Sequence, residues 1–274
     1  MLARASYDPR GMTAFFNRLE RANRFYSSAP AYLRTHPLTT ERISDMQARS
    51  ESARYQQVED SLEFQLARAR LRARQGSAPD AVHAARRALD DKRYPNEAAA
   101  RYELVAALVR ARQFREAEAE VQKLLTAKRV SPMIQQQAAH VALVSGNPTL
   151  ALQRFGAGAA SYPGYRPLQY GYIDALLSAD RAKDALQQTD RQLSLYPLDR
   201  RLWQLAARVH AKLGNRLQSH RAQAEASALA GNLVAAIEQI NVGLKAGDGS
   251  FQEVSAAEAR RREWQETERA QRRD

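Results

Sequence analysis

Residues 146–164 read GNPTLALQRFGAGAASYPG, and two of their features return at a fixed interval along the chain. Tyr162-Pro163 is followed by Tyr196-Pro197, and each pair is suited to end a helix because a residue before proline is pushed out of helical geometry. A small residue recurs at the same interval through four units, at Ala117, Ala151, Ala185 and Ser219. A period of 34 held across four units predicts a protein built from stacked repeats.

Each unit contains two amphipathic segments of helical period joined by a short turn. Gly146, Asp180 and Gly214 mark this turn in successive units, and the recurring small residue lies early in the second helix, where the two helices cross closely. The pattern resembles the tetratricopeptide repeat, a helix–turn–helix unit of about 34 residues that stacks into a superhelix. The resemblance implies an all-α solenoid packed through a few small residues, which are Ala117, Ala151, Ala185, Gly146 and Gly214.

The repeats set the predicted domain boundaries. We expect a solenoid of five to six hairpins over residues 59–250 and a charged helix over residues 251–274 that caps the stack. Trp264 is the one large apolar side chain between residues 255 and 273. Gly214 and Gly231 are separated by only half a period, so the helix between them is expected to close one hairpin and open the next.

Residues 1–58 lie outside this pattern. They predict one helix from Met12 to Phe25, a loop around His36-Pro37, and a second helix that opens at Thr39 and continues towards Arg54. Two helices cannot bury a core by themselves. We therefore expect this segment to be the end of a domain whose beginning is missing.

Two phrases in this segment carry a more specific resemblance. Residues 2–12 read LARASYDPRGM and residues 32–43 read YLRTHPLTTERI, with a helix containing Phe-Phe between them. Together with the repeats that follow, they resemble the periplasmic H-E-x-x-H zinc metallopeptidases that carry tetratricopeptide repeats, of the β-barrel assembly-enhancing type found in Gram-negative bacteria. In that family two His and a later Glu hold the zinc, and the motif Glu activates the metal-bound water.

The resemblance implies the C-terminal portion of such a peptidase, with the metallopeptidase remnant over residues 1–58. No His in the sequence is followed by Glu, so we expect no catalytic residue and no zinc in this chain, and zinc only in a full-length protein. His36 is the candidate metal contact there, because in this family the His-Pro loop lies close to the zinc cleft. Within this chain a lone His cannot hold zinc, which takes about four ligands, and a helix cap is the simpler role.

The composition narrows the remaining functions. The chain has 42 Lys and Arg against 30 Asp and Glu, no Cys, and no apolar run of the ~20 residues that a membrane span needs. Without Cys, disulfides and cysteine nucleophiles are excluded. The formal charge of +12 favours acidic partners. We interpret the arginine runs at residues 68–74 and 260–262 as solvated helix faces, and we expect no nucleic-acid binding.

Two functions remain open. An interaction module would take an extended protein segment into the concave groove of the superhelix, with groove candidates Tyr165, Gln169, Tyr170, Tyr172 and Trp203. Core packing explains Tyr172 equally well. The resemblance implies that the partners are outer-membrane β-barrel proteins or their assembly machinery in the periplasm, although no export signal follows Met1. The alternative is a stand-alone adaptor for acidic proteins or nucleic acid, which duplex DNA binding with a steep salt dependence would support.

Overall fold

The computed structural model describes residues 2, 7–23, 39–51, 59–126 and 131–271, and every regular element within these ranges is a helix. The chain divides into two compact units, Met1–Ser61 and Leu62–Asp274. The all-α fold predicted from the sequence is therefore confirmed for the described part of the chain.

The first unit contains α1 (Arg10–Asn23) and α2 (Thr39–Glu51), which pack against each other. Helix α2 begins at Thr39, as the sequence predicts. Helix α1 begins at Arg10, earlier than the predicted start at Met12, because the Asp8 carboxylate accepts a hydrogen bond from the Arg10 backbone N–H at 3.0 Å and so caps an earlier turn. The His36 loop and the predicted helix ends at Phe25 and Arg54 lie outside the described residues.

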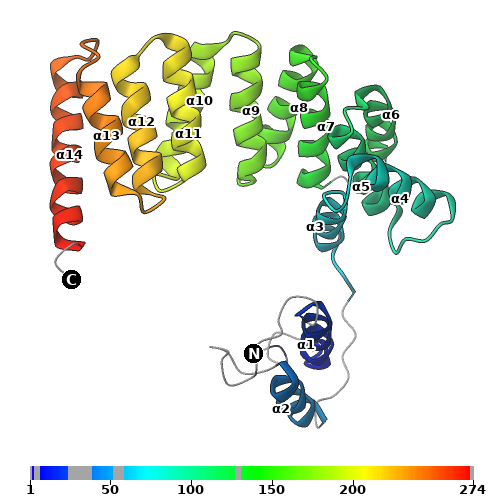
Figure 1. The fold of residues 1–274 in the computed structure, drawn as a ribbon. Helices are drawn as coiled ribbons and strands as arrows, with labels where there is room; N and C mark the ends of the chain where they lie inside the picture. Colours follow the sequence, from blue (N-terminus) through cyan, green and yellow to red (C-terminus); the bar gives the residue numbers. More distant parts are fainter. Residues whose placement is uncertain (1, 3–6, 24–38, 52–58, 127–130, 272–274) are drawn as a thin grey trace. The chain divides into compact units, whose positions relative to one another are not determined.

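The second unit is a stack of helices that follow one another in chain order (Figure 1). They are α3 (Leu62–Arg72), α4 (Ala78–Asp90), α5 (Glu97–Arg110), α6 (Phe114–Leu125), α7 (Pro132–Val144), α8 (Pro148–Ser161), α9 (Arg166–Ser178), α10 (Ala182–Leu195), α11 (Arg200–Leu213), α12 (Arg216–Ala228), α13 (Leu233–Leu244) and α14 (Phe251–Gln271). Helices α7, α9 and α11 start at intervals of one full period, and so do α6, α8, α10 and α12.

The turn inside each repeat uses one left-handed residue. The positive φ angles of four successive turns recur with the period of the sequence, at Arg112 (60°), Gly146 (81°), Asp180 (55°) and Gly214 (80°). Glycine adopts this conformation without the steric cost that a Cβ brings. The turn geometry therefore follows the repeat even where the residue is not glycine, which confirms the repeat register.

The recurring small residues lie at the crossing of the two helices in each repeat. Ala117, Ala151 and Ala185 are each the fourth residue of the second helix, and each side chain is completely buried. Ser219 holds the same position in α12, and its hydroxyl donates to the Ala207 carbonyl at 2.9 Å. A serine is thus accommodated at this crossing because its hydroxyl finds an acceptor on the facing helix.

Replacing these alanines tests the register directly. We expect Ala151→Leu and Ala185→Leu each to destabilise the fold by about 1–3 kcal/mol, because three extra carbons have no space between two crossing helices. Urea unfolding measures the change. Ala119→Leu on the exposed face of α6 is the matched control and should leave the midpoint unchanged. Native midpoints in both buried variants would show that the crossing points are assigned wrongly.

Contacts between repeats define an inner layer. The first helices of consecutive repeats, α3, α5, α7, α9 and α11, each contact the next one. The second helices α4, α6, α8 and α10 make at most marginal contact with one another in the described part of the chain. Helices that crowd together lie on the inside of a curved stack, and those that are splayed lie outside, so the first helices line the concave face.

The alternation of inner first helices and outer second helices shifts by one helix at α12, and this shift is here called the phase change of the stack. This helix packs against both α11 and α13, and it also contacts α14. Within the described residues, α11 makes no more than marginal contact with α13. The contacts confirm the prediction from Gly214 and Gly231 that the helix between them closes one hairpin and opens the next.

Candidate protein-docking surface

Side chains from equivalent repeat positions form rows along the inner face. With the first residue of α7, α9 and α11 as position one, position five is held by Gln136, Tyr170 and Gln204, and one period earlier by Tyr102 of α5, which is completely buried. Position nine is held by Ala106, His140, Asp174 and Arg208. Two cavities open along these rows, one at each end.

The first cavity, here called the basic pocket, lies across α3, α5 and α7 and has a volume of about 250 Å³. Its lining residues are Arg70, Ala73, Arg74, Ala106, Val109, Arg110, Gln136, Gln137 and His140. No carboxylate is among these lining residues. The pocket is therefore positively charged, since three arginines contribute to its wall.

The three arginines of the basic pocket differ in what they bind. Arg110 donates from Nη1 to the Ala73 carbonyl at 3.1 Å and also to the Gly76 carbonyl, so it closes the C-terminal end of α3. Arg70 and Arg74 are exposed, and no hydrogen bond or ion pair engages their guanidinium groups within the described ranges. These two groups are free to bind an anion.

The sequence predicts that the arginine run at residues 68–74 spreads around a solvated helix, and the structure shows its members on different sides of α3. Arg72 points to another side of α3, where its guanidinium forms an ion pair with Glu103 at 2.6 Å. Arg68 lies over the ring of Phe64, 5.5 Å from its centroid. Alternate arginines thus reach different neighbours, and only Arg70 and Arg74 of this run reach the inner face.

His140 is a half-buried wall residue of the basic pocket. Burial lowers the pKa of its imidazole, the nearby positive charge of Arg70 lowers it further, and Asp174 opposes the shift. The Gln137 side chain beside it donates to the Tyr102 carbonyl at 3.2 Å. The imidazole is therefore neutral at neutral pH and can accept a hydrogen bond inside the pocket.

The lowered pKa of His140 gives a pH-dependent stability. The unfolded chain protonates this histidine at its ordinary pKa, whereas the folded chain protonates it only at a lower pH. The free energy of unfolding therefore falls as the pH drops from the ordinary pKa of histidine to the lowered pKa of the folded state. We expect His140→Gln to flatten the fall in unfolding free energy between about pH 7 and pH 5. Burial also lowers the pKa of His210, so part of the pH dependence of the unfolding free energy remains in this variant. The control is exposed His83→Gln, and an unchanged slope in His140→Gln would contradict the prediction.

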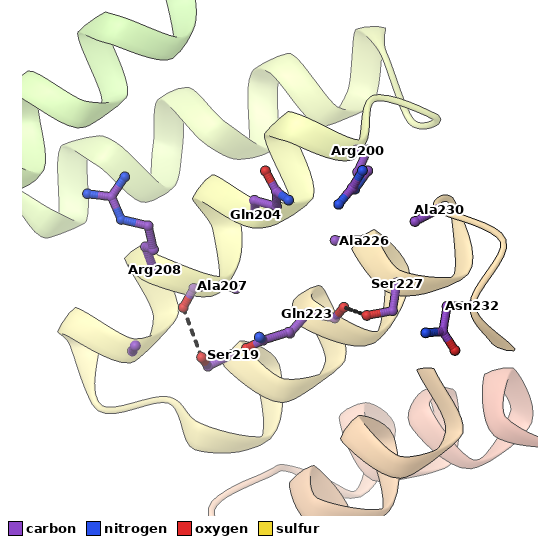
Figure 2. A pocket seen from close by; sticks show the side chains of 11 residues that line it. Arg200, Gln204, Ala207, Arg208, Ser219, Gln223, Ala226, Ser227, Ala230 and Asn232 are labelled. Atoms are coloured by element: carbon purple, nitrogen blue, oxygen red, sulfur yellow. Dashed lines mark hydrogen bonds between the residues drawn. The ribbon is translucent and has the colours of Figure 1, made fainter. Parts of the chain in front are cut away.

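The second cavity, here called the junction pocket, lies where the stack changes phase (Figure 2). It measures about 470 Å³ and lies between α11 and α12, with the start of α13 at one end. Its lining residues are Arg200, Gln204, Ala207, Arg208, Ala211, Ser219, Gln223, Ala226, Ser227, Ala230 and Asn232. Four of the lining residues are alanines, so short side chains form much of the pocket wall. As in the basic pocket, no carboxylate is among the lining residues.

The five groove candidates from the sequence line neither inner pocket. Gln169 is only 3% exposed, and its amide donates to the carbonyls of Ala159 at 3.1 Å and Pro163 at 3.3 Å. Its oxygen accepts from Gln188 at 2.7 Å. Gln169 therefore joins α8, α9 and α10 inside the fold and is not free for a ligand.

The aromatic candidates are also engaged within the fold. Tyr170 donates its hydroxyl to Asp199, and burial together with this bond raises its pKa to about 12. Tyr165 and Tyr172 pack against the core around Phe155. Trp203 donates from Nε1 to the Pro197 carbonyl at 2.8 Å and lines a separate cavity of about 240 Å³ with His210. Packing between repeats is thus the observed environment of these rings.

Asp199 joins several of these groups at the start of α11. Its carboxylate caps the helix by accepting from the backbone N–H of Arg201 at 2.9 Å, and it pairs with Arg166 at 2.7 Å. These donors hold the pKa of Asp199 below its usual range against the opposing effect of burial. The cluster orients α11 against α9 and so shapes the wall of the inner face.

The described residues contain no group of three or more His, Cys, Asp or Glu side chains placed to hold a metal ion. The donor set therefore does not fit zinc within these ranges. His36, the metal candidate of the sequence, lies outside the described residues. None of the described helices combines the length and the apolar character needed to span a membrane.

Sequence reasoning missed Arg70, Arg74, His140 and Arg200 as surface groups of the inner face. The periodic row could have found His140, which holds position nine of α7, because positions five and nine of each first helix face the same way. Arg200 holds position one of α11, and Arg70 and Arg74 lie in or just after α3, so the row does not single them out. Aromatic residue type was a weaker guide, since aromatic rings are mostly used for packing.

The repeat register, the turn geometry and the inner layer of first helices define a tetratricopeptide solenoid. A family model described as tetratricopeptide repeat matches residues 11–200, which is more than half of the chain. The chain belongs to the tetratricopeptide-repeat family. The match ends at the first residue of α11, one helix before the stack changes phase.

The chain is also similar to a particular group of curated proteins. It is 29% identical over 244 residues to the Beta-barrel assembly-enhancing protease of Escherichia coli K12, covering 88% of this chain and 50% of that protein. The Yersinia pestis protein of the same name is 26% identical over 241 residues, covering 86% and 49%. The resemblance drawn from the sequence is confirmed, and the chain spans about half the length of the curated relatives it matches.

Proposed function

We propose that this chain is a protein-interaction module that captures acidic, extended segments of partner proteins on the inner face of its solenoid. The observation that carries the proposal is the basic pocket, where Arg70 and Arg74 have no anionic partner within the described residues. Arginine binds carboxylates through two parallel hydrogen bonds, which makes such a pair specific for acidic side chains.

The pocket supplies more than charge. Gln136 carries an amide that can both donate and accept, and the neutral His140 adds a further hydrogen-bonding group. Ala106 and Val109 offer a small apolar surface between the polar groups. A mixture of this kind suits a peptide, whose backbone and side chains need hydrogen bonds and apolar contact together.

The similarity to Beta-barrel assembly-enhancing proteases supports a finer proposal. The chain is the repeat-bearing portion of a zinc metallopeptidase of that group, residues 1–58 belong to its peptidase domain, and residues 59–250 form the solenoid. Its partners are then outer-membrane β-barrel proteins or their assembly machinery, and its compartment is the periplasm. The solenoid holds an unfolded segment, while the zinc chemistry belongs to residues that this chain does not supply.

A binding titration tests the basic pocket. We expect a fluorescent peptide that alternates Glu and Ser to bind the wild type, and Arg70→Glu/Arg74→Glu to weaken binding at least about tenfold, or ~1.4 kcal/mol. The control is Arg115→Glu, which makes one such charge reversal at an exposed arginine of α6 away from the pocket. Fluorescence anisotropy gives the dissociation constants.

Two outcomes would contradict the proposal. One is equal binding of the peptide by the wild type and the double variant. The other is the absence of peptide binding together with salt-sensitive binding of duplex DNA, which would favour the nucleic-acid adaptor.

A further inference from the structure

The junction pocket exists because one helix face lacks the neighbour that it has in the preceding repeats. At position twelve of the first helix, Leu143 and Leu177 are half-buried and line neither inner pocket, and each lies in a helix that contacts the next first helix. The equivalent residue of α11 is Ala211, which is exposed. Helix α12 changes the phase of the stack, and no further first helix covers this side of α11 in the described part of the chain.

Several polar groups of the junction pocket have no partner in the part of the chain that the structure describes. The side chains of Arg200, Gln204 and Gln223 form no hydrogen bond or ion pair among the described residues, and Figure 2 shows them around the same hollow. Arg208, by contrast, is turned towards α9 and pairs with Asp174. One cation and two amides are therefore available to a ligand.

The alanines limit what can lie over them. Ala207 and Ala226 are buried, while Ala211 and Ala230 are exposed, so the surface between the polar groups consists of methyl groups. Such a surface gives little apolar area to a large side chain, but it permits a backbone to come close. A helical ligand would satisfy its own backbone and leave both glutamine amides without partners, whereas an extended backbone presents N–H and C=O groups to them.

We propose that the junction pocket binds an extended segment of a partner protein that has small side chains and a carboxylate. The backbone of the segment hydrogen-bonds to Gln204 and Gln223, its small residues lie over the alanines, and its carboxylate pairs with Arg200. This proposal rests on the protein-docking function and adds a second subsite to it. It differs from the basic pocket in selecting small side chains as well as negative charge.

Arg200 offers a variant that is not expected to unfold the helix on which it lies. It lies in the first turn of α11, where the helix dipole disfavours a cation and favours an anion. Arg200→Glu therefore leaves α11 at least as stable while reversing the charge at the pocket. Ala211→Trp fills the pocket from an exposed position, and Ala256→Trp on the exposed face of α14 is its control.

The test uses capped fluorescent peptides that alternate Ala and Asp, Ala and Asn, or Leu and Asp. For the Ala–Asp peptide, we expect Arg200→Glu and Ala211→Trp to weaken binding at least about tenfold. We expect Arg115→Glu and Ala256→Trp to bind it as the wild type does. The Asn and Leu peptides should bind the wild type about tenfold more weakly than the Ala–Asp peptide does.

The outcomes that contradict the junction pocket can be told apart from those that contradict the proposed function. Undiminished binding of the Ala–Asp peptide to Arg200→Glu and Ala211→Trp, with loss in Arg70→Glu/Arg74→Glu, overturns the junction pocket and leaves the proposed function standing. Binding of the Glu–Ser peptide but not the Ala–Asp peptide by the wild type has the same consequence. Binding of neither peptide rejects both proposals.

Discussion

Gly171→Ala is expected to destabilise the solenoid by about 3 kcal/mol, although alanine is normally the better helix former. Gly171 lies in α9 opposite the ring of Phe155 in α8, which is 1% exposed. A Cβ at this position would lie 2.6 Å from the Phe155 Cδ1 atom and closer still to two other ring carbons. The ring is rigid and enclosed, so it cannot move aside without disturbing the repeats on both sides.

The matched control for this prediction is Gly156→Ala, in the interior of α8. A Cβ there would meet the Tyr172 ring at 3.4 Å, which is an ordinary contact. We expect this variant to keep or raise the stability by up to about 1 kcal/mol, as helix propensity alone predicts. Phe155→Leu combined with Gly171→Ala should lose less than the sum of the two single changes. Additive losses in urea unfolding would contradict the proposed clash.

Arg260→Gln is expected to cost about 2–3 kcal/mol, because it leaves a buried carboxylate without its cation. Arg260 in α14 forms two hydrogen bonds of 2.9 Å with Glu225 of α12, whose side chain is 8% exposed. The Glu225 carboxylate raises the pKa of Arg260 above its ordinary value. The guanidinium also lies over the Trp264 ring, 4.9 Å from its centroid. This cluster attaches the last helix to the stack.

The double variant Glu225→Gln/Arg260→Gln separates the buried charge from general loss of packing. It should be more stable than Arg260→Gln alone, since no isolated charge remains in the interface. Arg262→Gln, an exposed change in the same helix, should have no effect. Urea unfolding and hydrogen exchange in α14 report the differences. A double variant as unstable as Arg260→Gln would show that packing and not charge attaches the helix.

The repeat could be predicted from sequence because its determinants are local. The regular interval through Ala151 and Ala185 reflects helix length, turn chemistry and a close crossing, and all of these lie within one unit. The turns at Gly146 and Gly214 adopt the left-handed geometry that glycine favours. The sequence predicts the phase change for the same reason, because the turn residues Gly214 and Gly231 lie half a repeat apart.

The candidate site could not be predicted in the same way, as Gln169 shows. A polar side chain on an inner helix suggests a ligand contact, but the carbonyls of Ala159 and Pro163 at the end of α8 need donors, and Gln169 supplies them. Those carbonyls reach Gln169 only when α8 folds back against α9. Conversely, Arg70 belongs to a charged run in the sequence and becomes a pocket residue through the placement of α5 and α7.

Local sequence was thus sufficient for the class of fold, the repeat length and the helix that changes the phase of the stack. Only the packed structure decided which inner-face groups remain free, because that depends on contacts between helices in different repeats. Arg200 shows the physical reason. Its freedom, and the hollow beside it, follow from a neighbouring helix that the preceding repeats have and α11 lacks within the described residues.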